Sequence, residues 1–147
     1  MNPPLRAEHD RDALIEGIID GSVDMIATDH APHTAEDKAK GLEGSAFGIV
    51  GLETSFPIMY TYLVKKGVIS LERLVELMSV KPAERFGIKV GESDLAVFEL
   101  SNEYAIDANE FLSKGRSTPF DGYKVFGRCV KTILNGEEIW TDVTIAK

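Results

Sequence analysis

The feature that most constrains this fold is a short apolar segment, residues 23–28, which ends abruptly at a run of polar residues. Strands that are buried on both faces of a parallel sheet have this continuous apolar character. Helical patterns come before and after the segment, and alternation of strands with helices is typical of α/β proteins. The sequence therefore predicts an α/β fold.

Four segments carry signals of helices. Apolar residues recur at helical spacing in three of them, and each has a suitable start or stop residue. The predicted helices cover about 10–20 with Gly21 as stop signal, 54–66 with Pro57 in its first turn, 71–78 with Ser70 as N-cap, and a short one from Pro82 to Gly87. A long loop, 30–51, joins the predicted strand to the second helix, and loops of this length tend to be functional or disordered.

The pattern changes after Gly87 to that of β-structure. Residues 95–100 resemble a strand, and 126–134 and 137–145 resemble a hairpin around Asn135-Gly136, which favours a type I′ turn. We therefore divide the chain into residues 1–87 and 88–147. Three strands do not form a stable sheet unless they pack against another element, so the second region is expected to lean on the first.

Composition excludes several classes of protein. The net charge of −8 argues against a nucleic-acid surface, and the acidic residues are expected to form a solvated exterior. The single cysteine, Cys129, cannot form an intrachain disulfide and is expected to be a small core residue. No apolar run reaches the ~18 residues of a membrane helix, so we expect a soluble cytoplasmic protein.

The residues that could ligate a metal or transfer a proton follow the predicted strand. Asp29 would lie at the carboxyl end of that strand, where parallel barrels place their active sites. A carboxylate there can ligate a metal or transfer a proton, and His30 and His33 add imidazoles. The alternative is that Asp29 is a turn or capping residue. The motif alone leaves both interpretations open.

A wider set of motifs resembles one family. Asn2-Pro3-Pro4-Leu5-Arg6, Thr28-Asp29-His30-Ala31-Pro32-His33, Phe47-Gly48 and Gly51-Leu52-Glu53-Thr54 occur in the order and rough spacing of the dihydroorotases, which belong to the amidohydrolase superfamily. The similarity continues through Lys81-Pro82-Ala83-Glu84-Arg85-Phe86-Gly87, Asp94-Leu95-Ala96-Val97-Phe98, Ser117-Thr118-Pro119-Phe120 and Asn135-Gly136. It thus covers essentially the whole chain.

The resemblance implies a fold and a reaction. Residues 1–87 would form the last βα units of an amidohydrolase-type (β/α)8 barrel, and 88–147 part of a small β-rich domain. The family interconverts N-carbamoyl-L-aspartate and dihydroorotate in pyrimidine biosynthesis. Asp29 would ligate one of two zinc ions and act as general base and acid, Asn2 and His33 would hydrogen-bond the substrate, and the backbone at Phe47 and Gly48 would close over it.

The sequence departs from the family in two ways. The other metal ligands of the family, including its His-x-His pair, are absent, and only three histidines are present. We therefore expect the first six barrel strands to lie elsewhere, the zinc site to be empty or incomplete in this chain alone, and the chain to need the missing barrel portion or an oligomer partner. In addition, the stretch between Gly87 and Ser93 is shorter than is usual in the family.

Several assignments keep alternatives. The substrate could instead be that of hydantoinase or allantoinase relatives, or the chain could be a non-catalytic module partnering aspartate transcarbamoylase. His30 either orients Asp29 or packs at the strand end. Arg6 is a candidate anchor for a carboxylate, against a structural role. His9 is expected to be exposed, and Trp140 to be core rather than a substrate platform.

Overall fold

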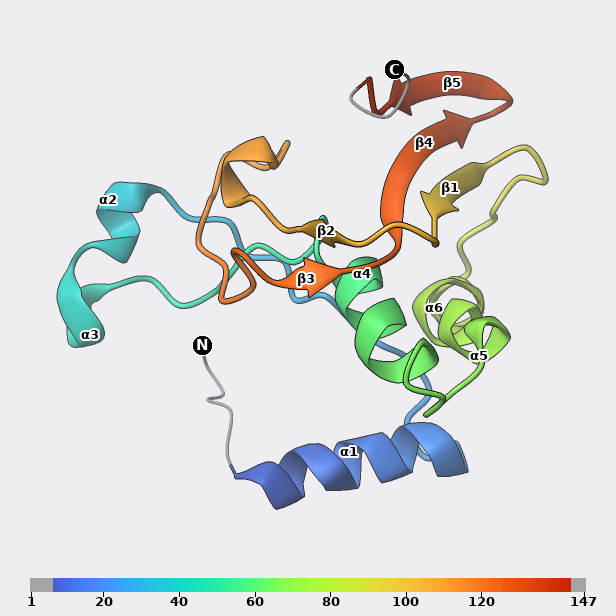
Figure 1. The fold of residues 1–147 in the computed structure, drawn as a ribbon, viewed down its shortest axis with the longest axis horizontal. Helices are drawn as coiled ribbons and strands as arrows, with labels where there is room; N and C mark the ends of the chain where they lie inside the picture. Colours follow the sequence, from blue (N-terminus) through green and yellow to red (C-terminus); the bar gives the residue numbers. More distant parts are fainter. Residues whose placement is uncertain (1–6, 144–147) are drawn as a thin grey trace.

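The computed structural model describes residues 7–143 and shows helices between α1 on one side and the larger sheet on the other (Figure 1). The loop that carries α2 and α3 projects away from this body. In chain order the elements are α1 (Glu8–Asp20), α2 (Ala35–Lys38), α3 (Gly41–Gly44), α4 (Ser55–Met59), η1 (Tyr60–Val64), α5 (Leu71–Val75), η2 (Glu76–Val80), α6 (Lys81–Phe86), β1 (Leu95–Glu99), β2 (Tyr104–Ala105), η3 (Ala108–Glu110), β3 (Lys124–Val125), β4 (Arg128–Leu134) and β5 (Glu137–Thr141).

The predicted central helices are confirmed. α4 continues into the π-helical η1, and α5, η2 and α6 follow one another without a break. The hydroxyl of Ser70 accepts a hydrogen bond from the Arg73 amide at 3.1 Å, as expected of an N-cap. Gly87 ends α6 in the left-handed conformation, with φ of 64°. The π-helical turn of η2 precedes Pro82, which has no N–H to donate to the turn before it.

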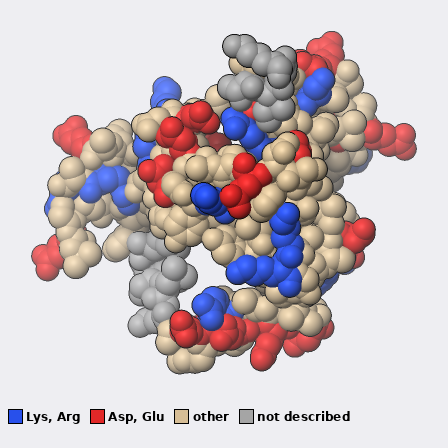
Figure 2. Space-filling model, viewed as in Figure 1, with Lys and Arg blue, Asp and Glu red and all other residues tan. Residues whose placement is uncertain are grey.

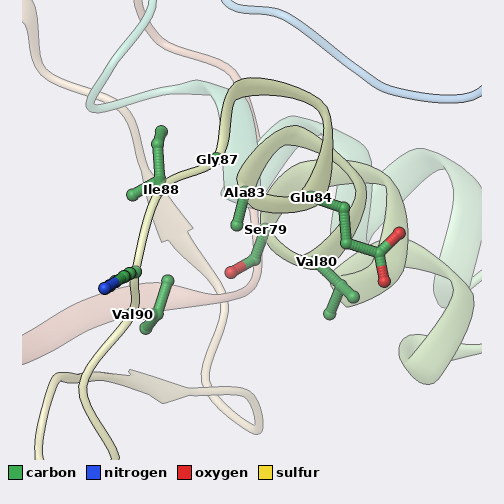
Figure 3. Close-up of a pocket in the computed structure, with 8 residues that line it drawn as sticks. Ser79, Val80, Ala83, Glu84, Gly87, Ile88 and Val90 are labelled. Carbon is green, nitrogen blue, oxygen red and sulfur yellow. The ribbon is translucent and has the colours of Figure 1, made fainter.

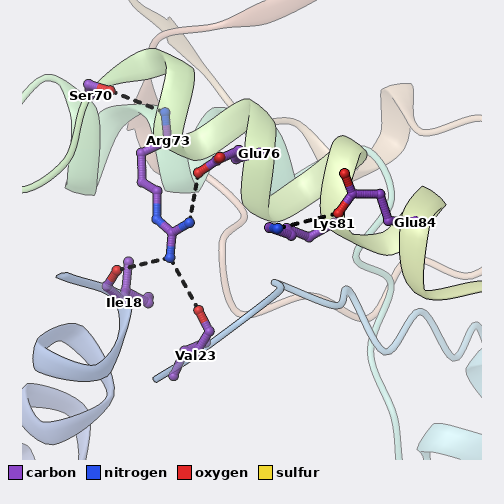
Figure 4. Close-up of polar contacts among 7 residues, drawn as sticks. All are labelled: Ile18, Val23, Ser70, Arg73, Glu76, Lys81 and Glu84. Atoms are coloured by element: carbon purple, nitrogen blue, oxygen red, sulfur yellow. Dashed lines mark hydrogen bonds and ion pairs between the residues drawn. The ribbon is translucent and has the colours of Figure 1, made fainter. Parts of the chain in front are cut away.

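Helix α1 is present and ends at Gly21 as predicted, but its apolar stripe, Leu14, Ile15, Ile18 and Ile19, is only partly covered. Leu14 is 62% exposed and Ile19 59% exposed. The apolar spacing of this helix predicts one buried stripe, and that prediction is wrong for Leu14 and Ile19, since helical periodicity does not say whether a covering surface is present. Arg73 ties α1 to the body, because its guanidinium reaches the carbonyls of Ile18 and Val23 at 3.5 and 3.4 Å (Figure 4).

The prediction of a strand over residues 23–28 is wrong. The segment is extended, but within residues 7–143 no strand pairs with it. The Ile26 amide donates to the Leu77 carbonyl at 2.9 Å, and His30 forms a single parallel bridge with Ile49. A strand needs a neighbour for its backbone hydrogen bonds, and the apolar pattern of a segment cannot reveal whether that neighbour is there.

Two antiparallel sheets make up the second half of the chain. β4 lies between β1 and β5 in the larger sheet, and β2 pairs with β3 in the smaller. The hairpin turn has φ of 53° at Asn135 and 80° at Gly136, and positive φ at both positions confirms the predicted type I′ geometry. The two-residue strands β2 and β3 and the 3-10 turn η3 were not predicted, since each is too short to carry a periodic pattern.

One apolar core joins the two regions of the sequence. Its buried residues are Val50, Ile58, Ile106, Ala108, Phe111 and Val125. A second contact reinforces this core, because Phe56 on α4 stacks on Phe98 of β1 with ring centroids 3.9 Å apart. The β-rich region therefore leans on the helices as expected, while the division at residue 87 stays a prediction.

The acidic residues of α1 are exposed, as predicted. Figure 2 shows acidic side chains gathered along this helix, which carries Glu8, Asp10, Asp12, Glu16 and Asp20. Among the helices of residues 7–143, none combines the length and the apolar character that a membrane span requires.

Candidate functional site

Asp29 ends the extended segment in a conformation that few aspartates adopt. Its φ is 47°, in the left-handed region, and its side chain lies at the surface. Asp and Asn are enriched among the few non-glycine residues found there, and such residues cluster at functional sites. The backbone thus turns sharply at the residue for which the sequence predicts the chemistry.

His30 links three segments that are far apart in the sequence. Its Nδ1 accepts hydrogen bonds from the amides of Gly51 and Leu52 at 3.0 and 3.3 Å, and its Nε2 lies 3.5 Å from the hydroxyl of Ser113. Of the two roles left open by the sequence, these contacts favour packing at the end of the extended segment. They fix the chain immediately after Asp29 to the loop that follows it.

His33 and Gly48 are brought together. A Cβ on Gly48 would lie 3.3 Å from Nε2 of His33 and 2.5 Å from the Cβ of Ala31, and Gly48 has φ of 116°. Only glycine fits such a position without movement of its neighbours. Phe47, beside it, has an exposed side chain. The other predicted substrate ligand, Asn2, lies outside the described residues, as does Arg6.

Lys38 contacts the backbone predicted to bind the substrate, although its place in the sequence did not single it out. Its Nζ donates to the carbonyls of Ala46 and Gly48 at 2.9 and 2.8 Å. In the sequence it is one of several charged residues in a polar loop, and only the closing of that loop shows what it contacts.

The described residues do not form a metal site by themselves. Within residues 7–143, no group of three or more His, Cys, Asp or Glu side chains lies close enough to hold a metal ion. Structural zinc takes four protein ligands and catalytic zinc typically three. Asp29 alone therefore does not supply the ligands of the two zinc ions that the resemblance implies.

Two cavities are lined by none of the predicted site residues that the structure describes. One, of about 470 Å³, lies between α6 and the segment that follows it, and Figure 3 shows Ala83, Gly87 and Ile88 among its lining residues. The other, of about 930 Å³, is lined in part by Glu53 and by Trp140. Trp140 is half-buried there, on β5.

Two residues remain whose side chains could take part in chemistry, Cys129 and His9. Cys129 is free and half-buried, rather than fully in the core, and its thiol lies 3.8 Å from the Lys131 carbonyl. The His9 side chain is exposed, as predicted, next to Asp10.

Glu53 is a half-buried acid of this region, and its surroundings shift its pKa. One carboxylate oxygen accepts a hydrogen bond from the Ser113 amide at 2.8 Å, and within the described part of the chain the other oxygen is buried without a partner. Burial opposes ionisation, but hydrogen bonds from the Ser113 amide and hydroxyl and from the backbone of Glu53 itself, together with His30, outweigh it and hold the pKa of Glu53 below its ordinary value of 4.5.

This lowered pKa predicts acid sensitivity. The ionised group contributes stability above pH 4.5, the unfolded value, and this contribution is lost as the pH falls through the lower folded value. As the pH is lowered from about 6 to about 3, we therefore expect the free energy of unfolding to fall less for Glu53→Gln than for the wild-type chain. Urea unfolding midpoints across this range measure the difference. Glu16→Gln, on the exposed side of α1, is the matched control. Parallel pH profiles for wild type and Glu53→Gln would contradict the prediction.

Comparison with known proteins identifies relatives along nearly the whole chain. The pattern of the Amidohydrolase family matches residues 2–139. The dihydroorotase of Bacillus caldolyticus is 54% identical over 95% of this chain, and so is that of Geobacillus kaustophilus (strain HTA426). The match covers 34% of each of those proteins, so this chain spans about a third of their length.

A solved structure agrees with these relatives. The L-hydantoinase (dihydropyrimidinase) of Arthrobacter aurescens superposes with a TM-score of 0.84 and 38% identity, over 95% of this chain and 33% of that one. This likeness confirms the α/β class and fits a partial barrel with a small β-rich domain.

Proposed function

The chain belongs to the amidohydrolase family, and from this premise we propose that it supplies the part of a dihydroorotase that carries the proton-transferring carboxylate, Asp29. The observation that carries the proposal is the 54% identity to curated dihydroorotases, against 38% to the hydantoinase structure. The left-handed backbone at Asp29 supports it, because the few non-glycine residues found in this region cluster at functional sites.

In this proposal Asp29 acts as both the base and the acid of ring opening. As water attacks the cyclic amide of dihydroorotate, the carboxylate takes one proton from the water. It then gives that proton to the departing ring nitrogen, and N-carbamoyl-L-aspartate results. A single group placed between the two atoms can act first as base and then as acid. His33 and the backbone at Phe47 and Gly48 would bind the substrate, together with Asn2.

The proposal requires more than this chain. We use "assembled enzyme" for this chain together with the portion of its relatives that it does not span. Zinc would be held there, with Asp29 as one ligand and the other ligands from the remaining portion or from an oligomer partner. Pyrimidine biosynthesis, a cytoplasmic location and a contact with aspartate transcarbamoylase belong to the same proposal.

A substrate panel tests it. We expect the assembled enzyme to convert dihydroorotate and N-carbamoyl-L-aspartate into each other, with far lower rates on hydantoin and allantoin, and to lose activity when a chelator removes its metal. The chain by itself is the control and should be inactive. Preference for hydantoin would favour the hydantoinase alternative, which the superposed structure supports. No turnover of any of these substrates would favour a non-catalytic module.

A further inference from the structure

The loop between residues 34 and 48 is closed around the ammonium group of Lys38. This group donates to the carbonyls of Ala46 and Gly48, and the contacts are partly buried. The Ser45 hydroxyl donates to the Lys38 carbonyl at 2.9 Å, and the Ala46 amide donates to the Asp37 carbonyl at 3.1 Å. The four contacts together fold residues 45–48 back onto the end of α2.

The two carbonyl contacts also orient the backbone amides. In a trans peptide the C=O and the following N–H point in opposite directions. Since the Ala46 carbonyl points at Lys38, the Phe47 amide points away from it, and the ammonium polarises that N–H further. Charge-assisted hydrogen bonds of this kind are stronger than neutral ones, so they define the orientation firmly.

The same stretch of backbone adjoins His33. The space that a side chain would need at Gly48 is already taken by Ala31 and by Nε2 of His33, 3.3 Å from the position of the missing Cβ. The Phe47 amide is one residue away. The His33 imidazole therefore lies against Gly48, next to the peptide group that carries the Phe47 amide, and both groups can donate to an anion.

We propose that Lys38 is a positioning residue that orients the Phe47 amide, beside His33, toward the carboxylate of the substrate. This inference rests on the proposed function, since it takes dihydroorotate as the anion. Lys38 itself would not touch the substrate, and its effect would pass through the backbone that it holds.

Lys40 provides a matched control. It is the same residue type, two positions along the same loop, and its ammonium forms an exposed ion pair with Asp37 at 2.7 Å. Loss of its charge changes the field of the loop without releasing the carbonyls of Ala46 and Gly48.

The test is steady-state kinetics of the assembled enzyme with dihydroorotate. We expect Lys38→Met to raise KM about tenfold with little change in kcat, because the substrate carboxylate keeps its charge in the transition state and the lost binding is uniform. Lys38→Arg should recover part of the KM, and Lys40→Met should match the wild type. A fall in kcat at unchanged KM would mean misfolded enzyme and would overturn the inference.

Amide hydrogen exchange on the 147-residue chain separates this inference from the proposed function. Lys38→Met should speed the exchange of the Ser45 and Ala46 amides, which donate to the carbonyls of Gly41 and Asp37, and Lys40→Met should not. Unchanged exchange in Lys38→Met, or faster exchange with an unchanged KM, would also overturn the inference. Faster exchange in an assembled enzyme whose wild type hydrolyses no dihydroorotate would reject the proposed function and leave the contacts of Lys38 supported.

Discussion

Asp29→Asn is expected to lower kcat/KM of the assembled enzyme for dihydroorotate by about a thousandfold or more, since one group performs both proton transfers. Asparagine keeps the size of the side chain but cannot accept the proton from the attacking water. Initial rates in both directions, followed by the absorbance of the ring, measure the effect. Both directions should fall together, because the same proton passes through the same atom.

Asparagine is also the right replacement for the backbone. With φ of 47° at Asp29, alanine would add conformational strain, whereas Asp and Asn both tolerate the left-handed region. A loss of activity in Asp29→Asn at unchanged zinc content therefore reports on proton transfer rather than on folding or metal loss. Asp24→Asn, at an exposed position in the same segment, is the control and should retain full activity. Full-speed hydrolysis by Asp29→Asn would reject the assignment of Asp29.

Leu74→Ala is expected to destabilise the chain by about 2–5 kcal/mol, the range for a leucine removed from a packed core. Leu74 is 0% exposed, in the middle of α5. Val75→Ala is the matched control. The Val75 side chain, next to Leu74 in the sequence, is 44% exposed, so its truncation should cost about 1 kcal/mol or less. Urea unfolding followed by circular dichroism gives both values. Equal losses in the two variants would show that α5 does not pack as described.

The effect of Leu74→Ala should reach the extended segment. Leu77, one turn further along the same continuous helix, is also fully buried, and its carbonyl accepts the Ile26 amide. Loosening of α5 and η2 would therefore release the backbone three residues before Asp29. In the assembled enzyme, Leu74→Ala should for this reason reduce the active fraction as well as the stability.

Local features of the fold were predictable from the sequence. The helix boundaries at Ser70 and Gly87 depend on one capping residue each, and the hairpin depends on two turn residues. Short-range hydrogen bonds and backbone preferences decide such features, and these are properties of a few adjacent residues. A turn at Asp29 was one of the two interpretations that the sequence left open.

Features that depend on distant segments were not predictable. Lys38 contacts backbone up to ten residues away, and His30 contacts Ser113, which is 83 residues away. Whether the segment 23–28 forms a strand depends on a neighbour, and whether Leu14 is buried depends on a covering surface. Neither kind of partner is encoded in the local pattern.

The contacts of His30 limit what its ring can bind. Two N–H groups donate to Nδ1, so this nitrogen holds a lone pair, and a neutral imidazole then carries its proton on Nε2, facing the Ser113 oxygen. Neither nitrogen is left with electrons to offer a cation. Although it is adjacent to Asp29, His30 is therefore not a zinc ligand in this conformation, and any imidazole that coordinates zinc in the proposed enzyme must come from another position.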